Sequence, residues 1–265
     1  MTQCTQQPQT LTLEEYVKKP PFIGLLQFET GTACNGKCTF CKHREMKRSG
    51  KASWNTIFEV IDTCVPYAQT VCPFLMQEPF LEPRLPAILD NIKQVNPRVN
   101  TQIYTNMAKL PAWWRSLIDE QTLDTMIVSF YGPTAKTYLK YQPGFSWQRT
   151  QRNIRDFMAY RKQRGLSKPH VTMHMINLPE LFKHYPSFVN HWKPVVDNVG
   201  VTVYRTHDEE DTNFQTTPEI AIYEQAVLGK PAQKRVPCSR IWGGFYVLFN
   251  GDVVPCSADY DGENV

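Results

Sequence analysis

The segment QFETGTACNGKCTFC, residues 27–41, places three cysteines in a short loop directly after an apolar run. Cys34, Cys38 and Cys41 are separated by three and two residues. An odd number of thiols on one loop cannot pair completely as disulfides, and soft thiolate ligands suit a metal ion or an iron–sulfur cluster. Three cysteines on a four-iron cluster leave one iron open to bind another molecule. The spacing therefore predicts a catalytic metal centre on residues 34–41, called the cysteine loop below.

A zinc site is the alternative use of these cysteines. His43 would complete a Cys3His set, and structural zinc sites take four such ligands. Zinc loops normally pair two close cysteines with a second, distant pair of ligands, whereas His43 lies only two residues beyond Cys41. The iron–sulfur interpretation is favoured, and zinc stays open.

The rest of the chain alternates between short β-branched or aromatic runs and helix-like segments, which is typical of a βα repeat with a parallel sheet. Six βα units are too few to close an eight-stranded barrel. The expected fold is therefore α/β, a partial (β/α)6 TIM-like barrel with its chemistry at the carboxyl ends of the strands. Expected strands are Phe22–Glu29, Thr70–Leu75, Asn100–Thr105, Thr125–Phe130, His170–Met175 and Asn198–Tyr204; expected helices are Trp54–Cys64, Pro83–Gln94, Ala112–Asp119, Trp147–Gln163, Glu180–Asn190 and Pro218–Val227.

Polar residues share one face of two expected strands. Gln102, Tyr104 and Asn106 alternate along the third strand, and His170 and His174 along the fifth, where Val171, Met173 and Met175 take the opposite face. A cavity inside the barrel and satisfied polar groups in the core explain this pattern equally well.

A hairpin is expected near the end of the chain. Asn250-Gly251 separates two β-rich runs, 245–249 and 252–256, and Asn-Gly suits the positive φ angles of a type I′ turn. The expected organisation is a leader at 1–20, the barrel at 21–229 and a small C-terminal cysteine-bearing β-hairpin appendage at 230–265. The appendage is expected to be truncated, because no closing element follows Cys256.

Composition excludes several classes of protein. The chain has 265 residues, of which 42% are hydrophobic and 20% charged, which excludes a disordered tail or a fibrous repeat. A net charge of +4 without a Lys/Arg block gives no support for a nucleic-acid partner. No apolar run approaches the roughly 18 residues of a membrane span, and residues 1–20 lack a signal-peptide core. We therefore expect a cytoplasmic protein with reduced thiols and no membrane partner.

The CxxxCxxC spacing after the first strand, with Phe40 before the third cysteine, resembles the radical S-adenosylmethionine (radical SAM) superfamily. The resemblance implies a [4Fe–4S] cluster on Cys34, Cys38 and Cys41, whose open iron chelates S-adenosyl-L-methionine (SAM). One electron then cleaves SAM to methionine and a 5′-deoxyadenosyl radical, which abstracts a hydrogen atom from substrate. The implied partners are an external electron donor of the flavodoxin or ferredoxin type and a small-molecule or peptide substrate.

Motifs at later strand ends are similar to those of the same superfamily. MQEPFLEPRL, residues 76–85, looks like its GGEP segment and implies that Glu78 accepts a hydrogen bond from the SAM ammonium, although Met76 and Gln77 replace the two glycines. IYTN, residues 103–106, resembles the T-N-G turn and implies Asn106 near SAM. Each motif alone fits an ordinary strand-end turn, and their agreement in order supports the resemblance.

Two further cofactor-binding residues follow from the same comparison. VSFYG, residues 128–132, is similar to the S-x-D-G motif, which implies that Ser129 binds the ribose hydroxyls. Asn177, just past the fifth strand, is a weaker candidate. No catalytic residue of the protein is assigned.

The C-terminal cysteines resemble the opening of SPASM or twitch domains. Cys238 and Cys256 are separated by seventeen residues, and Gly251 is placed as GxxxxC. The resemblance implies an auxiliary [4Fe–4S] cluster, incomplete here because those domains carry further cysteines downstream. A disulfide or two unconnected buried thiols are the alternatives. Cys64 and Cys72 are expected toward the opposite end of the barrel, as small buried hydrophobic residues.

The expected function is a radical SAM enzyme that oxidises or epimerises a small polar molecule, or modifies a peptide or protein. A radical SAM enzyme acting on RNA and a non-catalytic zinc or iron–sulfur binding protein stay open as alternatives.

Overall fold

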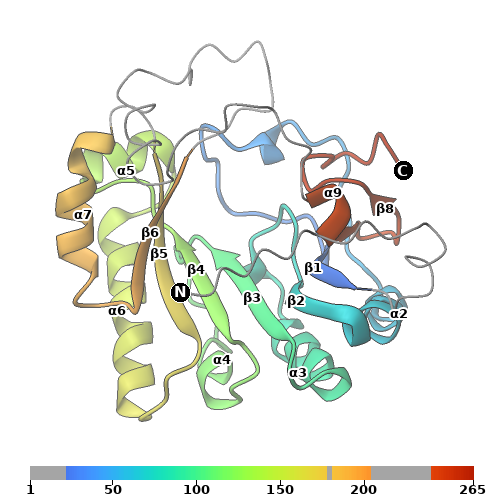
Figure 1. Ribbon diagram of the computed structural model, residues 1–265. Helices are drawn as coiled ribbons and strands as arrows, with labels where there is room; N and C mark the ends of the chain where they lie inside the picture. Colours follow the sequence, from blue (N-terminus) through green and yellow to red (C-terminus); the bar gives the residue numbers. More distant parts are fainter. Residues whose placement is uncertain (1–21, 178–180, 204–239) are drawn as a thin grey trace, which may run out of the picture.

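The computed structural model describes residues 22–177, 181–203 and 240–265, and its centre is an eight-stranded sheet (Figure 1). The strand order is β6-β5-β4-β3-β2-β1-β7-β8, and the first six strands are parallel to their neighbours. This confirms the expected α/β class, in an arrangement consistent with a partial barrel. The strands are β1 Ile23–Phe28, β2 Ala68–Cys72, β3 Asn100–Thr105, β4 Thr125–Ser129, β5 His170–Asn177, β6 Asn198–Val203, β7 Gly244–Val247 and β8 Val253–Val254.

Helices cover the outer face of the curved sheet (Figure 1). Several begin at a side-chain cap: the Ser53 hydroxyl accepts the N–H of Thr56 at the start of α2, and Ser146 caps α6 in the same way. The described helices are α2 Trp54–Cys64, α3 Leu85–Val95, α4 Ser116–Asp119, α5 Ala135–Tyr141, α6 Trp147–Gln163, α7 Tyr185–Trp192 and α9 Arg240–Gly243.

The expected helices agree with the observed ones where the apolar period is long. The bounds of α2 and α6 are as predicted, whereas α4 is a single turn and α7 begins at Tyr185, after a 3-10 turn. The sequence analysis missed α5, which has only seven residues and is held by a capping box between Thr134 and Thr137.

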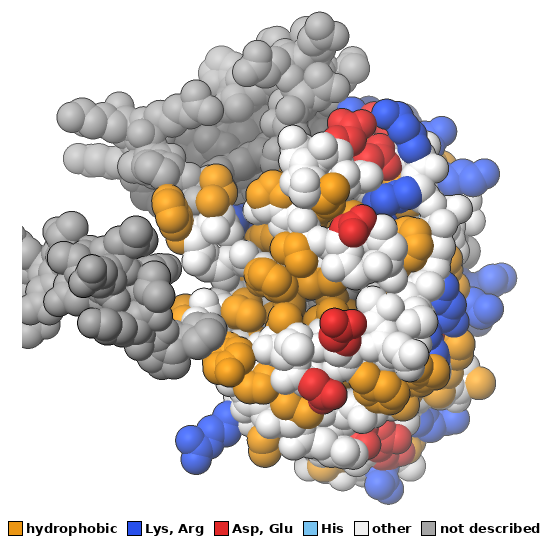
Figure 2. Space-filling model, turned by 90° about the vertical axis from the view of Figure 1, so that its right-hand side faces the viewer, with side chains coloured by type: hydrophobic (Ala, Val, Ile, Leu, Met, Phe, Trp, Pro, Cys, Tyr) orange, Lys and Arg blue, Asp and Glu red, His pale blue; other side chains and the backbone are white. Residues whose placement is uncertain are grey.

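The core lies between the sheet and these helices. Val171, Met173 and Met175, expected on one face of the fifth strand, are 0–1% exposed, and Ile103, Val128 and Phe157 are fully buried with them. Burial of this apolar face leaves the opposite face of the strands to line the inside of the barrel. Figure 2 shows charged side chains of both signs dispersed over the face that carries α2 and the C-terminal hairpin.

The C-terminal hairpin is confirmed, but its turn and its attachment differ from the expectation. Gly251 has φ +96°, and its N–H donates to the carbonyl of Leu248 at 3.0 Å. In the described ranges the only non-glycine residues with positive φ are Met107 and Gln121, so the turn is not type I′. Strand β7 pairs in parallel with β1, from Leu25 opposite Gly244 to Phe28 opposite Val247. The hairpin therefore continues the barrel sheet.

Several expectations fall outside the described residues: the leader, the helix at Pro218–Val227, Cys238 and the start of the appendage. No helix in the described ranges is both long enough and apolar enough to cross a membrane.

Candidate functional site

A cavity of about 480 Å³ lies inside the curve of the sheet, toward the carboxyl ends of its parallel strands. We call it the lumen cavity. Six of the nine predicted site residues line it: Cys34, Cys38, Cys41, Glu78, Asn106 and Ser129. Other polar lining residues are Gln27, Gln77, Gln102, Tyr104, Thr105, Tyr131, Gln142, His174 and Arg240.

Backbone and ring contacts hold the cysteine loop over this cavity. The N–H of Thr39 donates to the carbonyl of Tyr141 at 3.1 Å, and the N–H of Cys41 to that of Cys38 at 3.1 Å. The ring of Phe40 packs edge-on against Tyr131, with 5.0 Å between ring centroids. A Cβ atom at Gly36 would meet the Phe145 ring at 3.3 Å and touch the sulfurs of Cys34 and Cys38 at 3.5 and 3.6 Å, so a side chain longer than a methyl group would crowd this part of the loop.

Burial makes the three thiols poor acids in the absence of a cation. It raises the pKa of Cys34 to about 11 and that of Cys38 to about 12, and it also raises the pKa of Cys41. Negative charge on the neighbouring thiols adds to the rise for Cys34 and Cys38. A bound metal centre supplies the positive charge that such thiolates need, and a thiol that coordinates a metal is deprotonated.

The donor set fits an iron–sulfur cluster better than a zinc ion. Within the described residues, no three Cys, His, Asp or Glu side chains gather tightly enough to hold a single metal ion. The Nε2 atom of His43, the fourth ligand of the zinc alternative, lies 2.7 Å from the carbonyl oxygen of Thr32 and is engaged there. A four-iron cluster takes each thiolate on a different iron, so its ligands stand further apart than those of one ion.

Glu78 is a buried carboxylate that joins the cysteine loop to β3. Its Oε1 accepts the hydroxyl of Thr105 at 2.6 Å and the N–H of Phe80 at 3.1 Å, and its Oε2 accepts the N–H of Asn106 at 2.8 Å. Its backbone N–H donates to the carbonyl of Ala33, next to Cys34. Burial raises the pKa of Glu78 to about 7 even though these hydrogen bonds oppose the rise.

Asn106 is fixed by contacts on both sides. Its Nδ2 donates to Oδ1 of Asn35 in the cysteine loop at 2.8 Å, and its Oδ1 accepts the N–H of Ala108 at 2.9 Å. The next residue, Met107, has φ +53° and is fully buried. It stands where the T-N-G motif carries glycine, and its left-handed backbone explains why that motif uses glycine. The sequence analysis did not identify Met107, because its residue type does not indicate a left-handed backbone.

Ser129 ends β4, and a buried amide braces its backbone. Nε2 of Gln142 donates to the carbonyl of Ser129 at 3.1 Å, while Oε1 of Gln142 accepts the N–H of Tyr131 at 2.9 Å. Gln142 is fully buried. No local motif identifies Gln142, because it contacts Ser129 from a loop after α5, thirteen residues further along the chain.

Cys72 is placed differently from the expectation. It is the last residue of β2, is 1% exposed and lines the lumen cavity, so its assignment to the opposite end of the barrel was wrong. The expected strand was set two residues too late, which moved Cys72 toward the strand start. Of the two histidines of β5, His174 lines the cavity, whereas His170 is exposed and lies 4.0 Å from Asp197.

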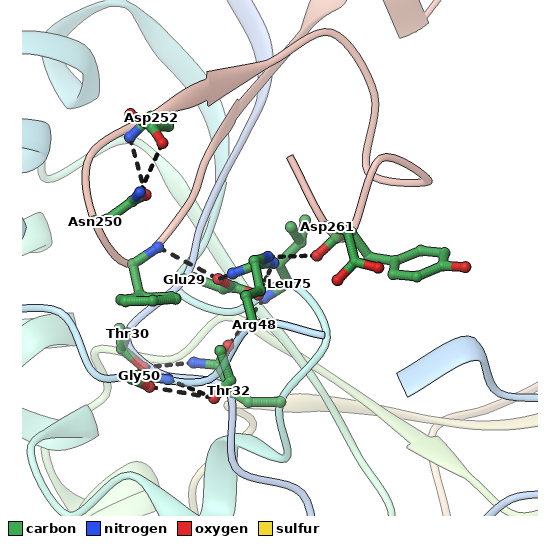
Figure 3. A network of polar contacts seen from close by, with 12 residues as sticks. Glu29, Thr30, Thr32, Arg48, Gly50, Leu75, Asn250, Asp252 and Asp261 are labelled. Atoms are coloured by element: carbon green, nitrogen blue, oxygen red, sulfur yellow. Dashed lines mark hydrogen bonds and ion pairs between the residues drawn. The ribbon is translucent and has the colours of Figure 1, made fainter. Parts of the chain in front are cut away.

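A polar network ties β1 to the segment after the cysteine loop and to the C-terminal tail (Figure 3). The guanidinium of Arg48 binds both oxygens of Glu29, one at 2.8 Å, and also donates to the carbonyl of Tyr260. The N–H of Phe249 donates to Glu29 at 3.3 Å. Gln77, which replaces a glycine of the GGEP-like motif, donates to the hydroxyl of Thr30 at 2.6 Å.

Three predicted site residues are not among those that line the cavity in the part of the chain that the structure describes. Cys256 lies half-buried after β8, and its sulfur accepts the N–H of Ala258 at 3.4 Å. Asn177 ends β5, and its side chain is outside the description, as is Cys238. Their roles stay predictions.

Comparison with known proteins identifies one family and several solved structures of similar fold. A family model described as the Radical SAM superfamily matches residues 28–185, more than half of the chain. No curated protein matches the sequence.

Three solved structures illustrate the likeness of fold. SuiB from Streptococcus suis bound to S-adenosylmethionine superposes with a TM-score of 0.69 at 15% identity, over 92% of this chain and 62% of SuiB. SuiB bound to its precursor peptide SuiA gives 0.66 at 13% identity, over 92% and 61%. BtrN in complex with AdoMet and 2-DOIA gives 0.51 at 17% identity, over 93% and 78%. The chain thus spans about three fifths of the length of SuiB.

Proposed function

Because the chain belongs to the radical SAM superfamily, we propose that Cys34, Cys38 and Cys41 hold its [4Fe–4S] cluster and that the lumen cavity binds SAM and a small polar substrate. When bound, the cluster supplies one electron that cleaves SAM to methionine and a 5′-deoxyadenosyl radical, which takes a hydrogen atom from the substrate. The observation that carries the proposal is that the three thiols, Glu78 and Asn106 line one cavity.

Glu78 is suited to hold the ammonium group of SAM. A carboxylate offers about four lone pairs, and three are used by Thr105, Phe80 and Asn106. The fourth is left for a cationic donor, which would keep Glu78 ionised although burial raises its pKa to about 7. Asn106, held by Asn35, would position the cofactor beside the cysteine loop, and Ser129 and Asn177 remain candidates for the ribose hydroxyls.

The substrate class follows from the lining of the cavity. The cavity volume of about 480 Å³ must hold SAM as well, so the substrate beside it would be a small molecule or one residue of a peptide. Gln27, Gln102, Tyr104 and Arg240 offer hydrogen bonds to hydroxyl, amino or acidic groups. Burial lowers the pKa of His174, so its imidazole is neutral at pH 7 and can accept the proton released in an oxidation. We propose an oxidation or epimerisation of a small polar molecule, begun when an external electron donor reduces the cluster. In an oxidation, the radical would take one hydrogen atom, His174 would accept the proton and the auxiliary cluster would accept the second electron.

A peptide is the second candidate substrate, favoured by the likeness of fold to SuiB in its complex with a precursor peptide. An auxiliary [4Fe–4S] cluster on Cys238 and Cys256 is a further part of the proposal. Its support is the C-terminal hairpin, which continues the barrel sheet and leads directly into Cys256.

Iron analysis together with SAM cleavage tests the proposal. After anaerobic reconstitution, we expect about four irons per chain at the cysteine loop, and formation of 5′-deoxyadenosine with dithionite and SAM. Both should be lost in Cys34→Ala/Cys38→Ala/Cys41→Ala and kept in the control Cys64→Ala, whose thiol does not line the lumen cavity. Zinc in place of iron, or a cluster that never cleaves SAM, would contradict the proposal. Roughly twice the iron would support the auxiliary cluster, as would loss of the excess in Cys256→Ala.

A further inference from the structure

The cysteine loop forms the wall between two cavities. The second one, of about 530 Å³, shares no lining residue with the lumen cavity and is lined by Asn35, residues 108–110 after β3, residues 144–146, and Arg149 and Asn153 of α6. We call it the outer groove. Cys34 lines the lumen cavity and the adjacent Asn35 lines the outer groove, so one loop faces both. The ring of Phe145, in the groove, lies only 3.3 Å from the place of a Cβ atom at Gly36.

The outer groove is basic. Lys109 and Arg149 line it, no Asp or Glu does, and Lys37 follows Asn35 by two residues. All three basic side chains are exposed. None of them forms an ion pair with another residue in the described ranges.

Three other basic residues that follow the loop are already neutralised. Lys42 pairs with Glu45 at 3.0 Å, Lys47 with Glu263 at 3.2 Å, and Arg48 with Glu29. The positive charge at the outer groove is therefore available to a partner, whereas these charges are committed to the fold. Exposed lysine and arginine side chains on an open groove suit an acidic protein surface better than a small anion, because a small anion needs buried donors to be held.

We propose that the outer groove is the docking site of an acidic one-electron carrier protein of the flavodoxin or ferredoxin type. The inference rests on the proposed function, in which the cluster must gain one electron from outside while the carrier loses one. Electron transfer slows steeply with distance, and a carrier in the outer groove would contact the cysteine loop that holds the cluster. Lys37, Lys109 and Arg149 would steer the carrier to this place and orient it.

A change of electron source tests the docking site separately from the chemistry. The variant Lys109→Glu/Arg149→Glu is compared with Arg98→Glu/Lys162→Glu, a matched reversal of one lysine and one arginine that are exposed and do not line either cavity. Formation of 5′-deoxyadenosine is measured with dithionite, which needs no docking, and with reduced flavodoxin at a subsaturating concentration. We expect the flavodoxin-driven rate of Lys109→Glu/Arg149→Glu to fall at least about tenfold, which corresponds to about 1.4 kcal/mol, with the dithionite-driven rate unchanged.

Salt and a neutral variant complete the test. Added salt should slow the flavodoxin-driven reaction of the wild type and of the matched control more than that of Lys109→Glu/Arg149→Glu, because it screens the attraction. Equal flavodoxin-driven rates in the two double variants would overturn the docking site. If Lys109→Glu/Arg149→Glu does not hold its cluster, the neutral variant Lys109→Gln/Arg149→Gln is used in its place. An unchanged flavodoxin-driven rate in this neutral variant would also overturn the docking site. Failure of the wild type with dithionite would refute the proposed function itself.

Discussion

Replacing Arg48 with methionine is expected to destabilise the protein by about 3–5 kcal/mol, because it leaves a buried carboxylate without its cation. The Glu29 side chain is fully buried, and Arg48 is only 14% exposed. In the wild type, both oxygens of Glu29 accept from the guanidinium, and the N–H of Phe249 is the one further donor among the described contacts. In Arg48→Met that single backbone donor, at 3.3 Å, would remain.

The same substitution would also loosen the C-terminal tail, by removing one of the contacts that hold it. Arg48 donates to the carbonyl of Tyr260, and the neighbouring Lys47 N–H donates to Asp261 at 2.8 Å. For a chain of this size, 1 kcal/mol shifts Tm by roughly 2–4 °C, so a Tm lower by roughly 6–20 °C is expected. Limited proteolysis should cut the tail of Arg48→Met before it cuts the barrel.

Chemical unfolding of the iron-free protein, followed by circular dichroism, measures this effect. The double variant Glu29→Met/Arg48→Met is the matched control, since it removes both charges and should recover most of the lost stability. A loss below about 1 kcal/mol in Arg48→Met would show that the pair behaves as a surface ion pair and refute the reasoning.

Substitutions at three other positions, Glu78, Gly36 and Met107, test the site. Burial raises the pKa of Glu78 to about 7, against an ordinary value of 4.5. The iron-free protein should therefore be most stable below pH 4.5 and should lose stability as the pH rises through 7. The loss should be on the order of 3 kcal/mol between pH 4.5 and pH 8 in urea unfolding, and this pH dependence should shrink in Glu78→Gln; a loss of equal size in the variant would contradict the assignment. Gly36→Val should crowd Phe145 and the sulfurs of Cys34 and Cys38, so that the reconstituted iron content falls by more than about half, whereas Gly243→Ala, which meets no atom within 4 Å, should keep full iron. Met107→Ala should lower the free energy of unfolding by about 2–5 kcal/mol through the cavity that it leaves. Met107→Gly should be about 1 kcal/mol more stable than Met107→Ala although it removes more atoms, because φ is +53° there; the reverse order would show that no backbone strain is present.

The sequence predicted those parts of the site that depend on local spacing. Cys34, Cys38 and Cys41 are close in the chain, so a single loop after β1 suffices to bring them together. Glu78, Asn106 and Ser129 line the same cavity because each lies at or beyond the end of a strand, and the carboxyl ends of neighbouring parallel strands meet at one edge of the sheet. Long apolar periods likewise predicted α2 and α6.

Tertiary structure alone decided the contacts between distant segments. Glu29 and Phe249 are 220 residues apart, and nothing near either residue indicates that β7 pairs with β1. Gln142 acts through its buried amide, and Met107 through its left-handed backbone. Packing imposes both features on residue types that do not indicate them in the sequence. Cys72 reaches the cavity because β2 ends three residues before the apolar pattern suggests. Periodicity and spacing determine which face a side chain takes and which loop it occupies, because those are properties of neighbouring residues. The choice of strand neighbours, and of which polar group meets which, depends on how the whole chain buries its apolar faces at once.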